Sequence, residues 1–478
     1  MASPATAAPQ YVRIAETLIG QIERGVLRAG DRAPSLRKLS TQQRVSVTTA
    51  LQSYMWLENR GFLEARPRSG FFVRQPFAAE IPEPTFEACT VREGVPGMDD
   101  ILEDVFTAAN DPASIGFGAG CASPELFPVR RLNLNLRRII HREPLHSSRY
   151  DFPPGAESLR RQIARRATSI QPGLSLRDVV ITNGALEAVG LGIRAVAKPG
   201  DAIAVESPTY FGILANLASI GMKIIEIPTH PQDGMDLGEL ERAIKKHKIK
   251  ACITMPNCHN PLGYILPDKH KKALAELTGR ANVAVIEDDV YTDLAADGVR
   301  PRTIKSYDKK GLVLLCSSFS KTLPPGYRVG WIMAGRYRAD VERLKFVTTV
   351  ATNSLAQRVI ADFLESGGYD RHLKRLRAAI ACQVESVRQA IARYFPPGTR
   401  ISRPAGGHLL WVELPPKTNS MKLYEAALAE HITILPGPVF CSANRYRNYI
   451  RINCGHTWSE KYERALLRLG QLAALARG

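Results

Sequence analysis

The feature that most constrains the fold is an alternation of short apolar runs with longer stretches of helical periodicity, from about residue 114 onward. The runs are rich in Val, Ile, Leu and Ala, as in strands that are buried on both faces of a sheet. They occupy residues 178–182, 202–205, 223–226, 250–254, 283–286 and 312–315. Strands separated by helices form a mainly parallel sheet with helices packed on it. The sequence therefore predicts an α/β domain.

This domain is expected to end in a smaller α+β part. Its helical content rises toward the C-terminus, and the two apolar segments Leu409–Glu413 and Tyr449–Asn453 have the pattern of strands. We therefore expect one domain over residues 114–478, with a large subdomain at about 114–340 and a small one at about 341–478.

A separate domain is predicted at residues 8–76. Apolar residues between Tyr11 and Ile22 fall at helical spacing, Gly25 ends that helix, and Ser35 and Ser46 are suitable N-caps for two more helices. The segments 62–65 and 70–74 then alternate like a hairpin. Three helices followed by a two-stranded wing form a winged helix-turn-helix.

The two domains are joined by residues 77–113, which are rich in Pro, Ala and acidic residues. The segment holds one short amphipathic piece, at about 98–106. We expect a linker that is partly packed and partly flexible.

Charge is concentrated at the N-terminus of the chain. Residues 1–79 hold eleven Lys and Arg against five Asp and Glu, a balance of +6, while the whole chain carries +18. An Arg-rich leading domain indicates attraction to phosphate backbones, although charge alone also fits a well-solvated face.

Several classes of protein are not expected. No apolar run approaches the length of a membrane span, and the N-terminus lacks the pattern of a signal peptide, so we expect a cytoplasmic protein without membrane contact. The eight cysteines form no C-x-x-C pair, which argues against a zinc site or a disulfide framework. We expect no metal.

Polar residues follow several predicted strands, where sites gather in open α/β sheets. Lys321 lies in Ser318-Phe319-Ser320-Lys321, and Arg328 is seven residues beyond it. The other candidates are Asp288 and Tyr291, Asn260 in Asn260-Pro261-Leu262-Gly263, Gly184 and Ala185 before a predicted helix, Tyr210, and Arg451 near the C-terminus.

This set resembles a fold-type I enzyme of the class I and II aminotransferases, which depend on pyridoxal 5'-phosphate. The S-x-S-K, N-P-x-G and D-x-x-Y motifs occur in the same chain order. The resemblance implies that Lys321 forms the internal aldimine and that Asp288 pairs with the pyridine nitrogen. It implies catalytic roles for Lys321, Asp288 and Tyr291. Asn260 and Tyr291 would hydrogen-bond the phenolate oxygen, and Asn260 would also contact substrate.

The remaining candidates follow from the same resemblance. Ser318, Arg328 and the Gly184-Ala185 turn would bind the phosphate, since helix N-termini and arginine forks suit anions. Tyr210 would stack on the ring, and Arg451 would receive a substrate carboxylate.

An uncharged amine is needed at Lys321, so we expect its pKa to be lowered by burial and by Arg328. The chain departs from the family at two positions, Leu186 and Leu262, where a polar or small hydroxyl residue is frequent. Phosphate binding beside Leu186 would then depend on backbone groups.

The N-terminal domain is similar to the GntR family of winged helices, over Gly30-Asp31-Arg32-Ala33-Pro34-Ser35-Leu36-Arg37-Lys38-Leu39-Ser40 and the segments that follow. By this resemblance the DNA-binding residues are Arg37, Ser46, Thr48 and Thr49 at the reading head, and Arg66, Arg68 and Gly70 at the wing. Val47 stands where relatives often have arginine, so we expect half-site spacing and the wing to supply more of the specificity. A winged helix used for protein contacts is the alternative.

The two resemblances together identify the MocR family, which includes the PdxR-type regulators. They imply a head-to-tail homodimer that binds operator DNA with repeated half-sites, and an effector that is pyridoxal phosphate or an amino acid. The chain is thus interpreted as a transcription regulator. An active aminotransferase of amino acids and 2-oxo acids, with an appended DNA-binding domain, remains the alternative because every transaminase residue has a counterpart.

Overall fold

A computed structural model gives the fold of the chain. It describes residues 10–28, 30–59, 62–66, 69–73, 81–86, 90–94, 103, 107, 111, 113–167, 174–443 and 445–476. Arg68 and most of the amphipathic piece expected at 98–106 lie outside these residues, and of Arg66 only the backbone is described.

The N-terminal domain has the predicted winged-helix elements. These are α1 (Gln10–Glu23), α2 (Leu36–Gln43), α3 (Val47–Asn59), β1 (Leu63–Arg66) and β2 (Gly70–Val73), with β1 and β2 antiparallel. Both predicted caps form: Ser35 Oγ accepts from the Lys38 amide at 3.3 Å, and Ser46 Oγ accepts from the Thr49 amide at 3.0 Å. Tyr54 is buried among the helices and donates to the Pro34 carbonyl at 2.6 Å, which joins α3 to the turn before α2.

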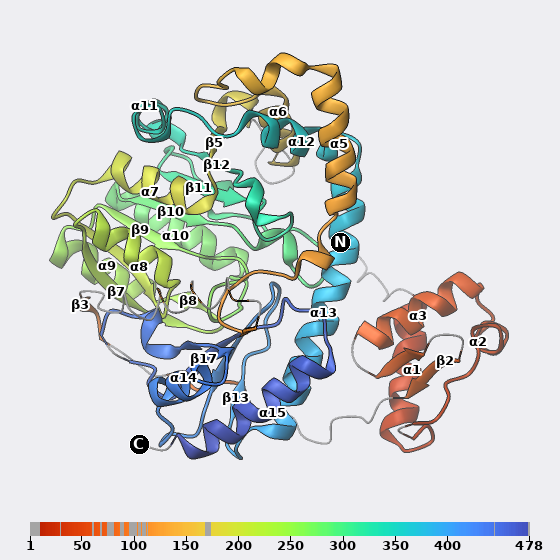
Figure 1. Cartoon of the computed structure of the whole chain (residues 1–478). Coiled ribbons are helices and arrows are strands. Elements are labelled where there is room, and N and C mark those ends of the chain that lie inside the picture. Colours follow the sequence, from red (N-terminus) through yellow and green to blue (C-terminus); the bar gives the residue numbers. More distant parts are fainter. Residues whose placement is uncertain are drawn as a thin grey trace, which may run out of the picture.

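The large domain is built on a mainly parallel sheet, as predicted (Figure 1). Across the sheet the strands are β3 (Arg92–Gly94), β7 (Lys223–His230), β6 (Ala202–Ser207), β9 (Ala251–Thr254), β10 (Ala284–Asp288), β11 (Val313–Ser318), β12 (Gly330–Met333) and β5 (Val180–Thr182). The run from β7 to β11 is parallel, whereas β3 and β12 are antiparallel to their neighbours. The sequence did not predict β12, which lies between β11 and β5.

Side chains alternate between the two faces of this sheet, and both faces are covered. On β11, Leu314 packs with α7 (Ala185–Val196) and α8 (Phe211–Ser219), while Val313 packs on the opposite side with α9 (Leu237–His247) and α10 (Asp268–Ala281). Leu315 faces a third cluster formed with α5 (Val129–Arg142), α6 (Glu157–Ala167) and α12 (Ser354–Glu365). Burial on both faces explains why the strands are continuous apolar runs.

The small domain combines a second sheet with three helices drawn from the C-terminal third. The sheet joins β13 (Arg400–Ile401), β14 (Leu409–Glu413), β17 (Tyr449–Asn453) and β16 (Leu435–Pro436), and the helices are α13 (Gly368–Tyr394), α14 (Ser420–Leu428) and α15 (Glu460–Leu475). β14 and β17 have the bounds that the sequence predicted. The long helix α13 runs past both subdomains (Figure 1).

Two described stretches of the segment between the two domains are packed on the aminotransferase-like part. Residues 81–86, called the strap below, lie on the small domain: the Ile401 amide donates to the Pro82 carbonyl at 3.0 Å, and the Thr85 amide donates to Glu413 at 2.6 Å. Further along, β3 pairs with β7 and so becomes an edge strand of the main sheet.

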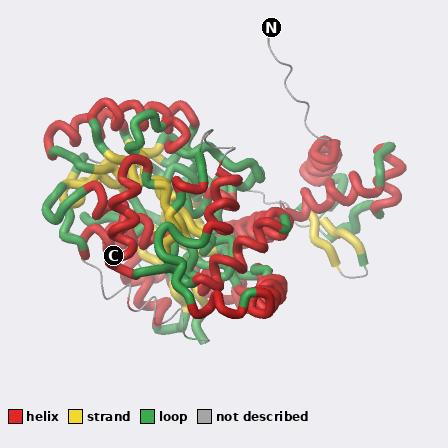
Figure 2. The backbone as a smooth tube through the Cα atoms, turned by 90° about the horizontal axis from the view of Figure 1, so that it is seen from above, coloured by secondary structure: helices red, strands yellow, loops and turns green. Residues whose placement is uncertain are grey.

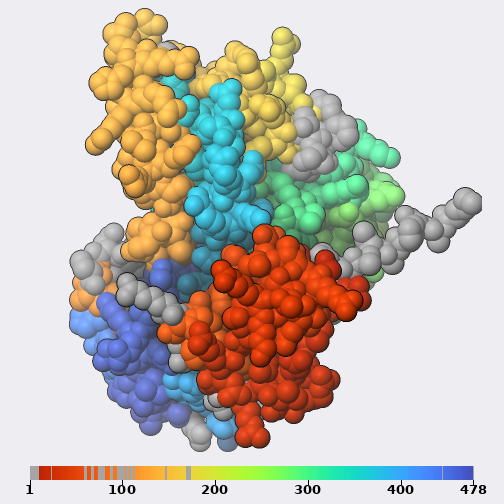
Figure 3. Space-filling view, turned by 90° about the vertical axis from the view of Figure 1, so that its right-hand side faces the viewer, coloured from red at the N-terminus to blue at the C-terminus, as the bar shows by residue number. Residues whose placement is uncertain are grey.

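The winged helix stands to one side of the other domains (Figure 2). Its helix α3 contacts α13, and the winged helix, α5 and α13 share one face of the molecule (Figure 3). None of the helices in the described part of the chain has the length and apolarity needed to span a bilayer.

Candidate functional site

A cavity of about 350 Å³ opens where the parallel strands of the main sheet end. β10 ends at Asp288, β11 ends at Ser318, and loops after β6 and β9 bring Tyr210 and Asn260 to the same place. The cavity therefore collects the cofactor- and substrate-binding candidates named from the sequence, apart from Gly184. Those that line it are Ala185, Tyr210, Asn260, Asp288, Tyr291, Ser318, Lys321, Arg328 and Arg451, and Gly184 precedes Ala185.

Lys321 projects into this cavity from the loop after β11. Its Nζ donates to the Gly120 carbonyl at 2.7 Å and lies 5.2 Å from the centre of the Tyr291 ring. Burial lowers the pKa of Lys321, but the acidic groups of Tyr291, Cys121 and Tyr210 together outweigh burial, and the pKa is raised above its ordinary value. The expected lowering of the pKa of Lys321 by burial and by Arg328 is therefore wrong, because the net shift is upward.

Asp288 is 5% exposed, and its Oδ1 has no hydrogen-bond partner among the described residues. Burial, followed by the charge of the neighbouring Asp289, raises the pKa of Asp288 to about 7. A buried carboxylate oxygen without a partner is costly unless a ligand supplies a donor. The geometry thus leaves a free acceptor at the floor of the cavity.

Arg451 reaches the cavity from β17 of the small domain and is 1% exposed. Its Nη1 donates to Asn260 Oδ1 at 3.2 Å and its Nη2 donates to the Gly118 carbonyl, while Nε has no partner among the described residues. Burial lowers its pKa. Within the described ranges no carboxylate forms an ion pair with Arg451, so this buried cation has neutral partners and room for an anion.

Two tyrosines and a histidine, Tyr210, Tyr291 and His408, surround the charged groups of the cavity. Tyr291 is 2% exposed, and its ring meets that of His408 edge to face at 5.6 Å. Burial raises the pKa of the Tyr210 hydroxyl. Burial, and then the charge of Lys321, lowers the pKa of His408 to about 3, so this imidazole is neutral.

The opposite end of the cavity has the features of an anion site. Gly184, with φ +90°, precedes the first residue of α7, and a Cβ at Gly184 would lie 2.6 Å from Arg328 Nη2. The positive φ favours glycine at this position, and the absence of a Cβ lets the Arg328 guanidinium approach the turn. Arg328 is exposed and donates to the Asn183 carbonyl at 3.0 Å, and Ser318 lines the same end. Leu186 also lines it without a polar group, so backbone groups of α7 and Arg328 carry the positive potential.

These features fit pyridoxal phosphate. The free oxygen of Asp288 would accept from a donor such as a protonated ring nitrogen, and the α7 terminus with Arg328 suits a phosphate. Lys321 lines the same cavity with its amine, and Tyr210 and Tyr291 supply aromatic surface. The roles assigned to the individual residues stay predictions.

Three participants were missed by sequence reasoning. The loop Gly118–Cys121 supplies the carbonyls that hold Lys321 and Arg451, and its signal was the spacing of Gly116, Gly118 and Gly120. His408 is buried behind Tyr291, and its Nδ1 lies 2.8 Å from Asn453 Oδ1. The third is a buried network around Arg300, for which no local motif exists.

The predicted DNA-reading surface is placed on the winged helix. Arg37, Ser46 and Thr48 are exposed, and Thr49 is partly exposed. Ser46 Oγ caps α3 and also lies 2.9 Å from Thr49 Oγ1, so part of its hydrogen-bonding capacity is used within the helix. Gly70 begins β2 with φ +96°, a conformation that suits the tight tip of the wing. The roles of these residues in DNA binding stay predictions.

The chain is similar over nearly its whole length to transcription regulators. Residues 10–73 match the gntR family of bacterial regulatory proteins, and residues 135–469 match aminotransferase class I and II. The chain is 37% identical over 463 residues to the HTH-type transcriptional regulator YdcR of Escherichia coli K12. This alignment covers 97% of this chain and 98% of the relative.

Solved structures resemble the C-terminal part. The kynurenine aminotransferase of Pyrococcus horikoshii, determined with PMP, superposes with a TM-score of 0.73 at 27% identity, covering 79% of this chain and 95% of that one. LysN, the α-aminoadipate aminotransferase of Thermus thermophilus, gives a TM-score of 0.73 at 24% identity over the same shares. The predicted fold class is confirmed, and homologues with this fold depend on pyridoxal phosphate.

Proposed function

This chain belongs to the aminotransferase class I and II family and joins to it a gntR-family DNA-binding domain, and we propose that it is a cytoplasmic transcription regulator that senses a ligand in its cofactor cavity. Its output is binding to double-stranded operator DNA with repeated half-sites. Its effector is pyridoxal phosphate itself or an amino acid that binds beside it. Lys321 carries the cofactor.

When bound, pyridoxal phosphate supplies an aldehyde for amine attack and an electron-withdrawing ring. Asp288 has a pKa of about 7, so its carboxyl takes up or releases a proton near neutral pH and can share one with a donor placed at Oδ1. Lys321 Nζ is held by the Gly120 carbonyl, which orients it toward the same space. Asn260 and Tyr291 offer hydrogen-bonding groups beside it.

Arg451 gives the cavity its preference for a carboxylate. A guanidinium fork matches a carboxylate in two parallel hydrogen bonds, and the low local polarity strengthens them. Because Arg451 is 1% exposed and has neutral partners only, an anionic ligand would compensate its buried charge. An α-amino acid brings both a carboxylate for Arg451 and an amine for the region of Lys321.

The observation that carries the regulatory proposal is the attachment of the strap to the strand that holds Arg451. Thr85 donates from its amide and its hydroxyl to Glu413, at 2.6 and 2.8 Å, and Tyr449 Oη donates to the Thr85 carbonyl at 3.2 Å. Tyr449 is two residues from Arg451 on β17, and Glu413 ends the paired strand β14. A shift of β17 on ligand binding would therefore move the chain that leads to the winged helix.

The test is to measure DNA affinity with and without candidate effectors. The cofactor-loaded full chain would be bound to duplex DNA that it has selected from a random pool, in the presence of each of the common amino acids and of added pyridoxal phosphate. We expect one of these to change the dissociation constant for DNA about fivefold or more. The effect should vanish in Arg451→Met and survive in Arg447→Met, an exposed arginine just before β17. If no effector changes DNA affinity, the regulatory proposal is wrong.

An aminotransferase activity is the second candidate function. It is favoured by the convergence of Lys321, Asp288 and Arg451 on one cavity, since sensing alone does not require a carboxyl at Asp288 with a pKa of about 7. The test is the transfer of the amino group from the bound amino acid to a 2-oxo acid, followed as new amino acid. Turnover that does not depend on DNA, together with DNA binding that ignores the amino acid, would favour this function.

We also propose that the chain acts as a head-to-tail homodimer. An exposed aromatic patch is formed by Tyr150, Phe152 and Phe346, whose rings lie 5.4 and 6.2 Å apart in succession, and Val347 extends it. The helix α11 (Arg338–Thr349) that carries Phe346 contacts α7, whose residue Leu186 is exposed at the cavity mouth. A patch of this kind marks an interface, and a second copy would place its residues beside the cavity.

Phe346→Glu should yield monomers in sedimentation; a dimer that persists would contradict this interface.

A further inference from the structure

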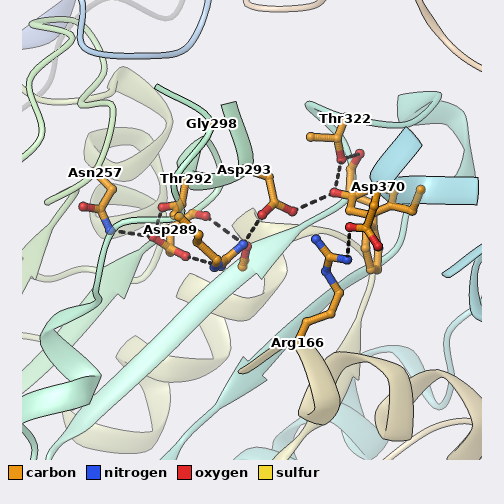
Figure 4. A network of polar contacts seen from close by, with 12 residues as sticks. Arg166, Asn257, Asp289, Thr292, Asp293, Gly298, Thr322 and Asp370 are labelled. Atoms are coloured by element: carbon orange, nitrogen blue, oxygen red, sulfur yellow. Dashed lines mark hydrogen bonds and ion pairs between the residues drawn. The ribbon is translucent and has the colours of Figure 1, made fainter. Parts of the chain in front are cut away.

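Behind the cavity lies a second group of charged residues that does not line it. Asp289 and Asp293 are buried, the side chain of Arg300 is 21% exposed, and Figure 4 shows the two aspartates as parts of one polar network. Arg300 lies between the two carboxylates: Nη2 is 2.8 Å from Asp289 Oδ2, and Nη1 pairs with Asp293 Oδ1. Two buried carboxylates without a cation would repel each other and lose much of their compensation.

The Asp289 side of the network reaches two segments of the cavity. Asp289 directly follows Asp288, so whatever holds its side chain also holds the backbone of that residue. Asp289 Oδ1 accepts from Asn257 Nδ2 at 3.0 Å and from the hydroxyl of Thr292. Asn257 begins the loop that carries Asn260, and its Oδ1 in turn accepts from Lys271 Nζ at 2.7 Å.

The Asp293 side reaches the lysine. Tyr369 Oη donates to Asp293 Oδ2 at 2.7 Å and lies 2.8 Å from Thr322 Oγ1. Thr322 directly follows Lys321, and its carbonyl is also 2.7 Å from His372 Nε2 on α13. Figure 4 shows this path running from Asp293 to Thr322, on the opposite side of Asp293 from Asn257.

We propose that Arg300 is a positioning residue for the cofactor site: by holding Asp289 and Asp293 together, it fixes the loops of Asp288 and Asn260 on one side and the loop of Lys321 on the other. Arg300 donates to two different carboxylates through two different nitrogens. The single nitrogen of a lysine ammonium group does not reproduce the spacing of these two donors. The inference rests on the cofactor site of the proposed function and is independent of DNA binding.

The electrostatic surroundings agree with this role. The charge of Asp289 is, after burial, the main cause that raises the pKa of Asp288. Burial raises the pKa of Asp289 itself, and Arg300 is the main charge that opposes this rise. Arg300 therefore also affects how far Asp289, the neighbour of Asp288, is ionised. Loss of Arg300 would change both the position and the ionisation of the carboxylate at the cavity floor.

The experiment compares Arg300→Met, Arg300→Lys and a matched control, Arg358→Met. Arg358 pairs with Asp151 at 3.1 Å and has 19% exposure of its side chain against 21% for Arg300, but it contacts none of the three cavity loops. For each protein one would measure the dissociation constant for pyridoxal phosphate, the visible circular dichroism of the bound cofactor, and the thermal midpoint of the apoprotein.

We expect Arg300→Met to bind the cofactor about tenfold more weakly or worse, and to alter its visible dichroism, with partial recovery in Arg300→Lys. Arg358→Met should change only the thermal midpoint. The inference is overturned if Arg300→Met keeps wild-type affinity and dichroism, or if both methionine variants lose affinity equally.

A milder variant keeps the test informative if Arg300→Met does not fold. Tyr369→Phe removes only the hydroxyl between Asp293 and Thr322 and keeps the ring packed against Phe319. It should alter the dichroism of the cofactor on Lys321 with a smaller loss of affinity, and an unchanged spectrum would contradict the Lys321 branch. Wild-type protein that binds no pyridoxal phosphate would instead contradict the proposed function itself.

Discussion

The winged helix and the cofactor cavity present charge in opposite ways. At the reading head, Arg37 and Thr48 are exposed to solvent, and the helix behind them is held by caps and an apolar core. In the cavity, Arg451 and Asp288 are 1% and 5% exposed, and each leaves a polar atom unpartnered in the described structure. A polyanion such as DNA can be bound by solvated cations, whereas a small ligand needs desolvated groups that are already in place.

This difference implies that substitutions in the two regions should act independently on the two ligands. The largest expected effect is that of Lys321→Ala. The variant should lose the visible absorbance of the lysine-linked cofactor completely and retain weak binding through the phosphate end of the cavity. Lys374→Ala, an exposed lysine of α13, should leave the absorbance unchanged. A wild-type spectrum in Lys321→Ala would remove this residue from its role.

A second prediction uses the pKa of Asp288, which burial and Asp289 raise to about 7. An unfolded aspartate titrates at about 3.9, so between these two pH values the folded apoprotein holds a proton that the unfolded chain has released. The carboxyl thus contributes stability at low pH that is lost as pH rises toward 7. As pH rises through this range, the free energy of unfolding of apo Asp288→Asn should therefore increase relative to that of wild type, by at most about 4 kcal/mol.

Urea unfolding of the two apoproteins at several pH values would measure this difference. The neighbours Glu287 and Asp289 are present in both proteins, so their titration largely cancels. A difference that stays constant from acid to neutral pH would show that Asp288 is ionised throughout, and the contrast between a costly buried site and a solvated reading head would then be weaker.

The same contrast explains what could be predicted from the sequence. Most strands of the sheet, the caps Ser35 and Ser46, and the cavity residues that belong to the three aminotransferase motifs follow from local patterns, each visible within a few neighbouring residues. The network around Arg300 could not be predicted, because Asn257, Asp289 and Tyr369 come together only through the packing of separate elements. β12 was missed for a related reason, since its pairing between β11 and β5 depends on the whole sheet.

The reading head should respond to loss of a single cation by a moderate amount. Arg37→Ala is expected to weaken binding to any duplex several-fold, by about 1 kcal/mol, and to reduce the dependence of log affinity on log salt by roughly one unit. Lys417→Ala removes the same charge from an exposed site of the aminotransferase domain and should change neither quantity. Pyridoxal phosphate affinity should stay at the wild-type value in both. An unchanged salt dependence in Arg37→Ala would place the reading head elsewhere.

The smallest expected effect tests whether the two regions communicate through the strap. Thr85→Val keeps the shape of the side chain and removes the hydroxyl that donates to Glu413 at 2.8 Å. One such hydrogen bond contributes about 1 kcal/mol, so the factor by which an amino acid changes DNA affinity should fall about two- to fivefold. Thr399→Val is the control, because that hydroxyl donates at 2.7 Å to the Pro396 carbonyl in its own loop and does not touch the strap.

Because coupling between two binding sites is reciprocal, the same variant must reduce equally the effect of DNA on the affinity for the amino acid. Affinities measured with one ligand alone should stay unchanged, since Thr85 contacts neither the cavity nor the reading head. If Thr85→Val alters binding of the amino acid in the absence of DNA, the strap shapes the cavity itself. If both coupling factors keep their wild-type value, the signal passes by another contact, and the packing of α3 against α13 is a candidate among the described residues.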